Sequence, residues 1–166
     1  MPGISIKPLT KTAFAAFGDV VEMDGAPTFT INQGFAERRN GLANVDILSE
    51  GGSTNIGLVV AKPRSFPMTV QLMERHPAGS QIFFPLQDRP WLVLVCTDPR
   101  DEASYRAFSA TGCQGVNYAK NIWHHPLIVF DRDSRFLIVD RGGPGKNLEE
   151  FLLEENQRIV LALPAG

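Results

Sequence analysis

Short runs of β-branched and aromatic residues alternate with clusters of glycine, proline, asparagine and aspartate along most of the chain. Apolar runs of this kind, bounded by residues that favour turns, are typical of β-strands. The segment 103–110 fits a helix or a strand, and a strand is the favoured interpretation. The pattern also predicts strands at residues 4–8, 19–22, 29–32, 55–61, 69–76, 81–85, 91–97, 116–118, 125–130, 136–140 and 158–163.

One segment near the N-terminus carries the signals of a short helix, at residues 11–17. Thr10 can cap its first turn, and Gly18 can end it in the left-handed conformation that costs glycine little. Residues 148–155 contain acidic side chains suited to the start of a helix. A second short helical turn is therefore expected near the C-terminus.

The order of these elements indicates the fold class. Long helices do not alternate with the strands, which argues against a doubly wound parallel sheet. Many short strands in 166 residues favour an antiparallel β-barrel or jelly roll with one or two short helices. The chain shows no repeat, linker or low-complexity tract, so residues 1–166 are expected to form a single, mainly β domain.

Composition and charge exclude several classes of function. Hydrophobic residues make up 43% of the chain and charged residues 20%, which is typical of a globular protein. The net charge is -2 and no cluster of Lys or Arg occurs, so a nucleic acid partner is not expected. No apolar run approaches the roughly 20 residues that span a bilayer, and the first residues lack the apolar core of a signal peptide. A cytoplasmic protein without a membrane partner is expected.

The predicted strand 69–76 carries the first candidate chemistry. With a period of two, Glu74 and His76 share one face and Arg75 lies on the other. A charge on a buried face is costly unless it is paired, bound to a metal or used in chemistry. Gln81 follows the turn after His76 and opens the next strand, so Glu74, His76 and Gln81 can converge at one end of a hairpin. The alternative is that they are ordinary solvent-exposed residues at a strand end.

The second candidate segment is 117–127, which contains Tyr118, Lys120, Trp123 and two adjacent histidines. Neighbouring residues of a strand point to opposite faces, so only one of His124 and His125 is expected to enter a barrel interior. The pattern does not choose between the two. A structural histidine in the core is the alternative to a functional one.

The third candidate segment is 31–39, with Asn32 and Arg38. A guanidinium group can bind a carboxylate through two parallel hydrogen bonds, so Arg38 or Arg39 is suited to an anionic substrate. Exposed arginines are common, and a surface role is the alternative. The glycine-rich segment 140–145 lacks the Lys-Ser/Thr pair of a phosphate-binding loop, which makes it a turn after a strand.

These segments, taken together and in order, resemble the ureidoglycolate lyase family, also named ureidoglycolate hydrolase. The similarity runs from about residue 6 to residue 145. The matching stretches are Ala16-Phe17-Gly18-Asp19-Val20, Ile31-Asn32 with Gly34, Glu37-Arg38, Glu74-Arg75-His76-Pro77, Gly115-Val116-Asn117-Tyr118, Trp123-His124-His125-Pro126-Leu127 and Asp140-Arg141-Gly142-Gly143.

The resemblance implies a cupin-like barrel, a homodimer, and the elimination of urea from (S)-ureidoglycolate to give glyoxylate in allantoin and purine breakdown. The hairpin with Glu74, His76 and Gln81 looks like the first cupin motif. Trp123-His124 looks like the second, which favours His124 as the inward residue. The family is associated with a divalent metal, nickel by convention, and the matching positions imply His76, Gln81 and His124 as its ligands. Glu74 and Gln81 depart from the usual histidine and glutamate of the motif.

The expected roles follow from the substrate that the resemblance implies. Glu74, His76 and His124 are the candidates for acid–base catalysis. A cupin oxygenase and a cupin that binds a small acid without turnover are the competing hypotheses, and residue chemistry alone does not separate a lyase from a hydrolase. The candidates for substrate binding are Asn32, Arg38, Arg75, Gln81, Tyr118, Lys120 and Trp123.

Overall fold

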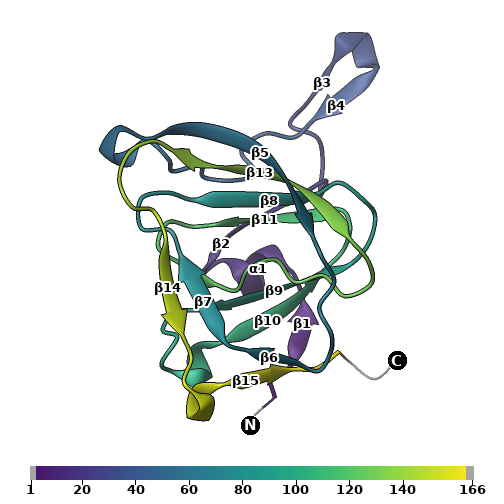
Figure 1. Ribbon diagram of the computed structural model, residues 1–166. Helices are drawn as coiled ribbons and strands as arrows, with labels where there is room; N and C mark the ends of the chain where they lie inside the picture. The colour runs from purple at the N-terminus through teal and green to yellow at the C-terminus, as the bar shows by residue number, and fades with distance from the viewer. Residues whose placement is uncertain (1–2, 164–166) are drawn as a thin grey trace.

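Two β-sheets face each other and form the body of the protein (Figure 1). The computed structural model describes residues 3–163. In spatial order, the six-stranded sheet contains β1 (Ile6–Pro8), β10 (Arg106–Ala110), β9 (Trp91–Cys96), β12 (Trp123–His124), β7 (Leu72–Arg75) and β14 (Glu149–Leu152). The five-stranded sheet contains β2 (Gly18–Glu22), β11 (Gln114–Tyr118), β8 (Gln81–Pro85), β13 (Ser134–Gly142) and β5 (Ser53–Ala61). The pairing within both sheets is antiparallel except between β1 and β10.

Two strand pairs lie outside these sheets. β6 (Met68–Val70) pairs with β15 (Ile159–Leu161) beneath the six-stranded sheet (Figure 1). β3 (Phe29–Ile31) and β4 (Ala36–Arg38) form a hairpin that projects from the body of the protein (Figure 1). The predicted mainly β architecture of antiparallel sheets is therefore confirmed, and β4 is a strand that the sequence pattern did not indicate.

The helix α1 (Lys11–Phe14) is shorter than predicted but begins as expected. The hydroxyl of Thr10 accepts a hydrogen bond from the backbone nitrogen of Ala13 at 3.1 Å, which caps the first turn. Gly18 opens β2 with φ +144°, and a Cβ there would collide with the backbone of Asn117. Short 3-10 turns occur at Asn32–Gly34, Ser49–Gly51, Glu102–Ser104 and Glu155–Gln157.

The central strand β9 shows why a continuous apolar run forms a strand here. All six of its residues are buried. Trp91, Val93 and Val95 point between the two sheets, where they pack against residues such as Phe14 of α1. The alternate residues Leu92, Leu94 and Cys96 face the second core, under β6 and β15. The six-stranded sheet is thus covered on both faces at β9, so neither face needs polar side chains.

Three predicted elements differ from the structure. The predicted strand 69–76 breaks at Gln71 into β6 and β7, so Val70 and Met73 pack in the same core although they differ in parity. The predicted strand 125–130 is mostly irregular, because Pro126 lacks a backbone N–H and only isolated bridges remain at Ile128 and Val129. The helical turn expected in 148–155 is the strand β14, since this segment pairs with β7.

The described part of the chain contains no helix with the length and apolar character that crossing a membrane requires.

Replacing Phe136 by alanine should destabilise the fold strongly. Its side chain is fully buried, with its ring centroid 5.0 Å from that of Trp91 and 6.4 Å from that of Phe83. A cavity of this kind typically costs about 3–5 kcal/mol, which denaturant unfolding would measure. The neighbouring Arg135 is exposed, so Arg135→Ala should change stability by less than about 0.5 kcal/mol. Equal effects of the two substitutions would contradict the proposed core position of Phe136.

Candidate active site and metal centre

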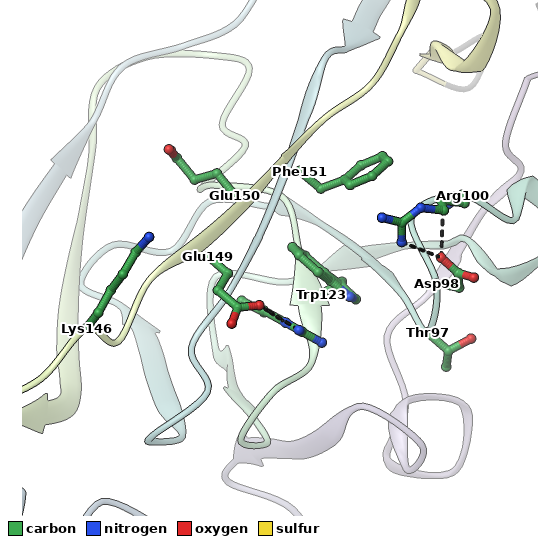
Figure 2. Close-up of a pocket in the computed structure, with 9 residues that line it drawn as sticks. Thr97, Asp98, Arg100, Trp123, Lys146, Glu149, Glu150 and Phe151 are labelled. Atoms are coloured by element: carbon green, nitrogen blue, oxygen red, sulfur yellow. Dashed lines mark hydrogen bonds and ion pairs between the residues drawn. The ribbon is translucent and has the colours of Figure 1, made fainter. Parts of the chain in front are cut away.

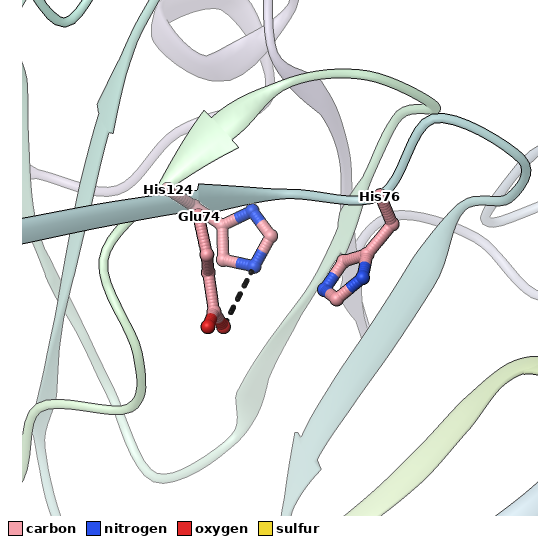
Figure 3. A group of neighbouring side chains, drawn as sticks. All are labelled: Glu74, His76 and His124. Carbon is pink, nitrogen blue, oxygen red and sulfur yellow. Dashed lines mark ion pairs between the residues drawn. The ribbon is translucent and has the colours of Figure 1, made fainter. Parts of the chain in front are cut away.

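Glu74, His76 and His124 gather between the two sheets (Figure 3). One donor atom from each side chain lies within 4.8 Å of the other two. His124 is 1% exposed, whereas Glu74 and His76 are partly buried. The structure thus brings together the three residues that the sequence analysis expected to carry the chemistry.

Neighbouring strands position this group. His124 of β12 is the register partner of Glu74 of β7, so their side chains project from the same face of the sheet. His76 lies two residues beyond Glu74, just after β7 ends. From the opposite sheet, the ring of Tyr118 stacks on that of His124 at 4.1 Å between centroids and 6° between planes. His124, rather than His125, is the member of the adjacent pair that joins the group.

Backbone carbonyls determine which nitrogen of each histidine carries hydrogen. Nδ1 of His76 lies 2.7 Å from the carbonyl oxygen of Asn147, and Nδ1 of His124 lies 3.0 Å from that of Ile122. A carbonyl oxygen only accepts, so both Nδ1 atoms must donate. In a neutral imidazole the Nε2 atom is then an acceptor. Both Nε2 atoms are buried and have no hydrogen-bond partner among the described residues.

The local electrostatics favour the unprotonated forms of Glu74 and His124. Burial lowers the pKa of His124, and this outweighs the opposite influence of Glu74. Burial raises the pKa of Glu74, but the interaction with His124 and the charges of the other histidines outweigh it, and the net pKa is lowered. At neutral pH the group therefore presents a carboxylate and a neutral imidazole, with Nε2 of His124 3.5 Å from Oε1 of Glu74.

These residues fit a divalent metal. Two imidazole nitrogens and a carboxylate oxygen form a donor set that transition metals accept, and second ring nitrogens bonded to carbonyls are typical of metal ligands. The sequence resemblance implied His76, Gln81 and His124 as ligands, whereas the histidine and carboxylate donors gathered here are Glu74, His76 and His124. The period of two predicted that Glu74 shares a face with His76, but the cupin resemblance directed attention to Gln81.

Gln81 lies on β8 in the opposite sheet, where its register partner is Tyr118. Its amide nitrogen donates to Oδ2 of Asp140 at 3.3 Å, and Asp140 also accepts from Asn55 at 2.8 Å. The amide oxygen of Gln81 is buried without a partner among the described residues. Gln81 is therefore an interior residue beside the ring that stacks on His124, which keeps it a candidate for substrate binding.

A cavity of about 530 Å³ adjoins the group through Glu74. Its walls are mostly apolar, and they include Phe83 and Ile138 from the five-stranded sheet. Two exposed cations, Lys62 and Arg64, also line it. Neither cation was predicted from the sequence as a site residue. They lie two residues apart directly after a predicted strand, and this spacing could have indicated that both side chains point to the same side of the chain.

Arg75 and Trp123 are not brought to the group. They line a separate cleft of about 680 Å³ on the other face of the six-stranded sheet (Figure 2). The guanidinium of Arg75 forms an ion pair with Glu149 at 2.6 Å and lies 4.5 Å above the Trp123 ring. Their expected role in substrate binding is not supported within one chain, because neighbours of Glu74 and His124 on a strand point to the opposite face.

Lys120, Asn32 and Arg38 also lie apart from the group. Nζ of Lys120 pairs with Asp46 at 3.1 Å and donates to the Ser49 hydroxyl at 2.6 Å, so it fastens the 39–52 connection. Asn32 and Arg38 belong to the projecting β3–β4 hairpin (Figure 1) and are exposed. The two cations and the one amide therefore lie in a loop and in the hairpin rather than in the cavity.

Comparison with known proteins agrees with the sequence resemblance. The family model described as ureidoglycolate lyase matches residues 1–160. Ureidoglycolate lyase 1 of Rhizobium meliloti (strain 1021) is 52% identical over 153 residues, which cover 92% of this chain and 90% of that protein. Ureidoglycolate lyase of Burkholderia mallei (strain NCTC 10229) is 49% identical over 94% of this chain and 92% of its own length. The corresponding protein of Pseudomonas syringae pv. tomato is 45% identical over 97% and 96%.

Solved structures show a weaker similarity. An oxalate decarboxylase of Bacillus subtilis with Mn(II) centres has a TM-score of 0.40 and 16% identity, covering 66% of this chain and 30% of its own. Oxalate decarboxylase of Lactobacillus farciminis has the same TM-score and identity, covering 89% of this chain and 33% of its own. The sequence relatives, in contrast, match over nearly their full length, and the chain therefore belongs to the ureidoglycolate lyase family.

Proposed function

We propose that this protein is a carbon–nitrogen lyase that splits (S)-ureidoglycolate into glyoxylate and urea, as a cytoplasmic step in allantoin and purine breakdown. Relatives at 45–52% identity carry the name ureidoglycolate lyase. The observation that carries the proposal is the meeting of Glu74, His76 and His124 beside a cavity that Glu74 lines. It supplies proton acceptors where a small polar substrate can reach them.

The reaction requires two proton transfers. Ureidoglycolate is a hemiaminal, in which one carbon carries a hydroxyl, a carboxylate and a urea nitrogen. Cleavage breaks the bond from this carbon to nitrogen, while the hydroxyl oxygen becomes the aldehyde oxygen of glyoxylate. The hydroxyl loses a proton and the departing nitrogen gains one, so no proton is consumed overall. A positioned side chain typically accelerates such transfers by about 10²–10⁴-fold.

Glu74 and His124 are suited to these transfers. The Glu74 carboxylate and Nε2 of His124 are both unprotonated at neutral pH and lie 3.5 Å apart. Either atom can take the hydroxyl proton and return it to the leaving nitrogen. Burial raises the pKa of Tyr118, and the charge of Glu74 raises it further, so the phenol stays neutral. Its ring holds the imidazole of His124 in place by stacking.

The same three side chains are the residues that would hold a divalent metal, and nickel is the metal we propose. Imidazole nitrogen is a ligand that nickel accepts, and both Nε2 atoms lack another partner among the described residues. A bound divalent cation would supply polarisation of the substrate hydroxyl and stabilisation of the alkoxide charge. The carbonyl of Asn147 makes Nδ1 of His76 the donor, so Nε2 is the nitrogen through which the neutral imidazole would bind a metal.

A homodimer is the proposed assembly, and the outer face of the five-stranded sheet is the proposed interface. Ile56, Leu58 and Val60 on the edge strand β5 are 69%, 74% and 60% exposed. Leu137 and Val139 of the adjacent β13 are partly exposed and have the parity of that outer face. An exposed apolar edge strand tends to associate with another chain unless it is covered, and a second copy of this protein would cover it symmetrically.

Purified protein should convert racemic ureidoglycolate into equal amounts of urea and glyoxylate, and His124→Ala should reduce turnover about tenfold or more. The reason is the loss of the buried Nε2 acceptor. Urea, ammonia and glyoxylate would be assayed, with circular dichroism as the check of folding. Ammonia in place of urea would assign a hydrolase, and wild-type turnover by the folded variant would remove His124 from the mechanism.

Metal content should depend on the three donors. After dialysis against nickel and then against buffer, Glu74→Gln and His76→Gln should each retain at most about a tenth of the wild-type metal, because each removes one ligand. Mass spectrometry of the metals would measure the content. His125→Gln is the matched control, since His125 is buried nearby but lies outside the group. Equal metal in all four proteins would refute the site.

The substitution Leu58→Glu should convert a dimer into a monomer, because it places a charge in the centre of the apolar strand face. Light scattering coupled to gel filtration would give the mass. Leu152→Glu is the control, since Leu152 is 73% exposed on β14 of the other sheet. A dimer that survives Leu58→Glu, or that Leu152→Glu dissociates, would locate the interface elsewhere.

A further inference from the structure

Lys62 and Arg64 stand on either side of Pro63, directly after β5 ends at Ala61. Pro63 forms a bridge to Val129, and the backbone nitrogen of Arg64 donates to the Val129 carbonyl at 2.8 Å. In extended chain, residues two apart point to the same side. The backbone is thus fixed while both cations line the cavity that Glu74 also lines.

Neither cation is neutralised by a carboxylate in the part of the chain that the structure describes. The ion pairs found there use other basic residues, such as Lys120 with Asp46 and Arg75 with Glu149. The cavity walls between the two cations and Glu74 are apolar. Two unpaired positive charges on one side of such a cavity favour a small anion.

The two cations and the acceptor group share one space. Lys62, Arg64 and Glu74 all line the same cavity of about 530 Å³. A cavity of this size accommodates one small molecule, which Arg64 and Glu74 can therefore both contact.

We propose that Arg64 and Lys62 bind the carboxylate of the substrate, which extends the proposed function and rests on it. The carboxylate of ureidoglycolate is attached to the carbon that carries the hydroxyl and the urea nitrogen. Its capture at the cavity rim therefore fixes the reacting carbon and leaves the hydroxyl free to face Glu74 and His124. Arg64 can form two parallel hydrogen bonds to it, and Lys62 adds a second charge. A neutral hemiaminal lacks this anchor and is excluded as a good substrate.

The kinetic test uses Arg64→Gln and Lys62→Gln. Each should raise KM for ureidoglycolate at least about tenfold while kcat changes less than about threefold, because an ionic contact to the substrate is lost and the acid–base group is intact. Arg64→Lys should recover part of the loss. Arg132→Gln is the matched control, since the Arg132 side chain is 69% exposed outside this cavity and the substitution removes the same charge. Unchanged KM in both cavity variants would overturn the assignment.

A binding test separates this proposal from the proposed function. Glycolate keeps the hydroxyl and carboxylate of the substrate, and glycolamide is its neutral counterpart. Calorimetry should show that wild-type protein and Arg132→Gln bind glycolate at least about tenfold more tightly than glycolamide, and that Arg64→Gln loses this preference. If the wild type binds glycolate in this way but does not cleave ureidoglycolate, the proposed reaction fails and the anion site stands. No preference for glycolate in the wild type, or an unchanged preference in Arg64→Gln, refutes the anion site.

Discussion

Two hydrogen bonds to backbone carbonyls organise the interior of this protein. The carbonyls of Asn147 and Ile122 take the Nδ1 hydrogens of His76 and His124. In the neutral imidazoles the two Nε2 atoms are then the acceptors, and they meet the carboxylate of Glu74 with no partner among the described residues. Acceptors that face one another in a buried place repel unless a proton or a cation lies between them. The group is therefore prepared to take up a positive species, whether the hydroxyl proton of a substrate or a divalent metal.

The packing of the two-layered fold offsets the stability that these unpartnered acceptors cost. β7 and β12 belong to a sheet that is packed on both faces around β9, so the strands that carry Glu74 and His124 are held by cores above and below. Tyr118 from the opposite sheet stacks on His124 and limits its rotation. Buried polar groups without partners cost stability, and native proteins accept that cost mainly where it serves function.

The sequence predicted the parts of the site that depend on strand periodicity. Because successive residues of a strand alternate in direction, Glu74 and Arg75 had to lie on opposite faces, and the structure places them so. Alternation could not choose between His124 and His125, because it gives relative and not absolute direction. It also could not place Arg64 in the cavity that Glu74 lines, since this arrangement depends on the β5–β6 connection lying along Val129. The partners of Lys120 likewise come from a distant loop, 71 residues earlier for Ser49.

On one side of β7 the charged side chains are paired within the fold, and on the other side they are left without a partner of opposite charge among the described residues. On the outer side, the guanidinium of Arg75 pairs with the carboxylate of Glu149 and lies over the Trp123 ring, so its charge already has partners within the chain. On the inner side, Glu74 faces acceptors, and the cations that share its cavity have no carboxylate partner in the described chain. Within the described part of the chain, Glu74 and His124 lack a proton donor, and Arg64 lacks an anionic partner. The substrate has both a hydroxyl proton and a carboxylate. The complementarity lies in the groups that the fold leaves unpaired, and in the proposed binding mode it would orient ureidoglycolate with its carboxylate at Arg64 and its hydroxyl at the acceptors.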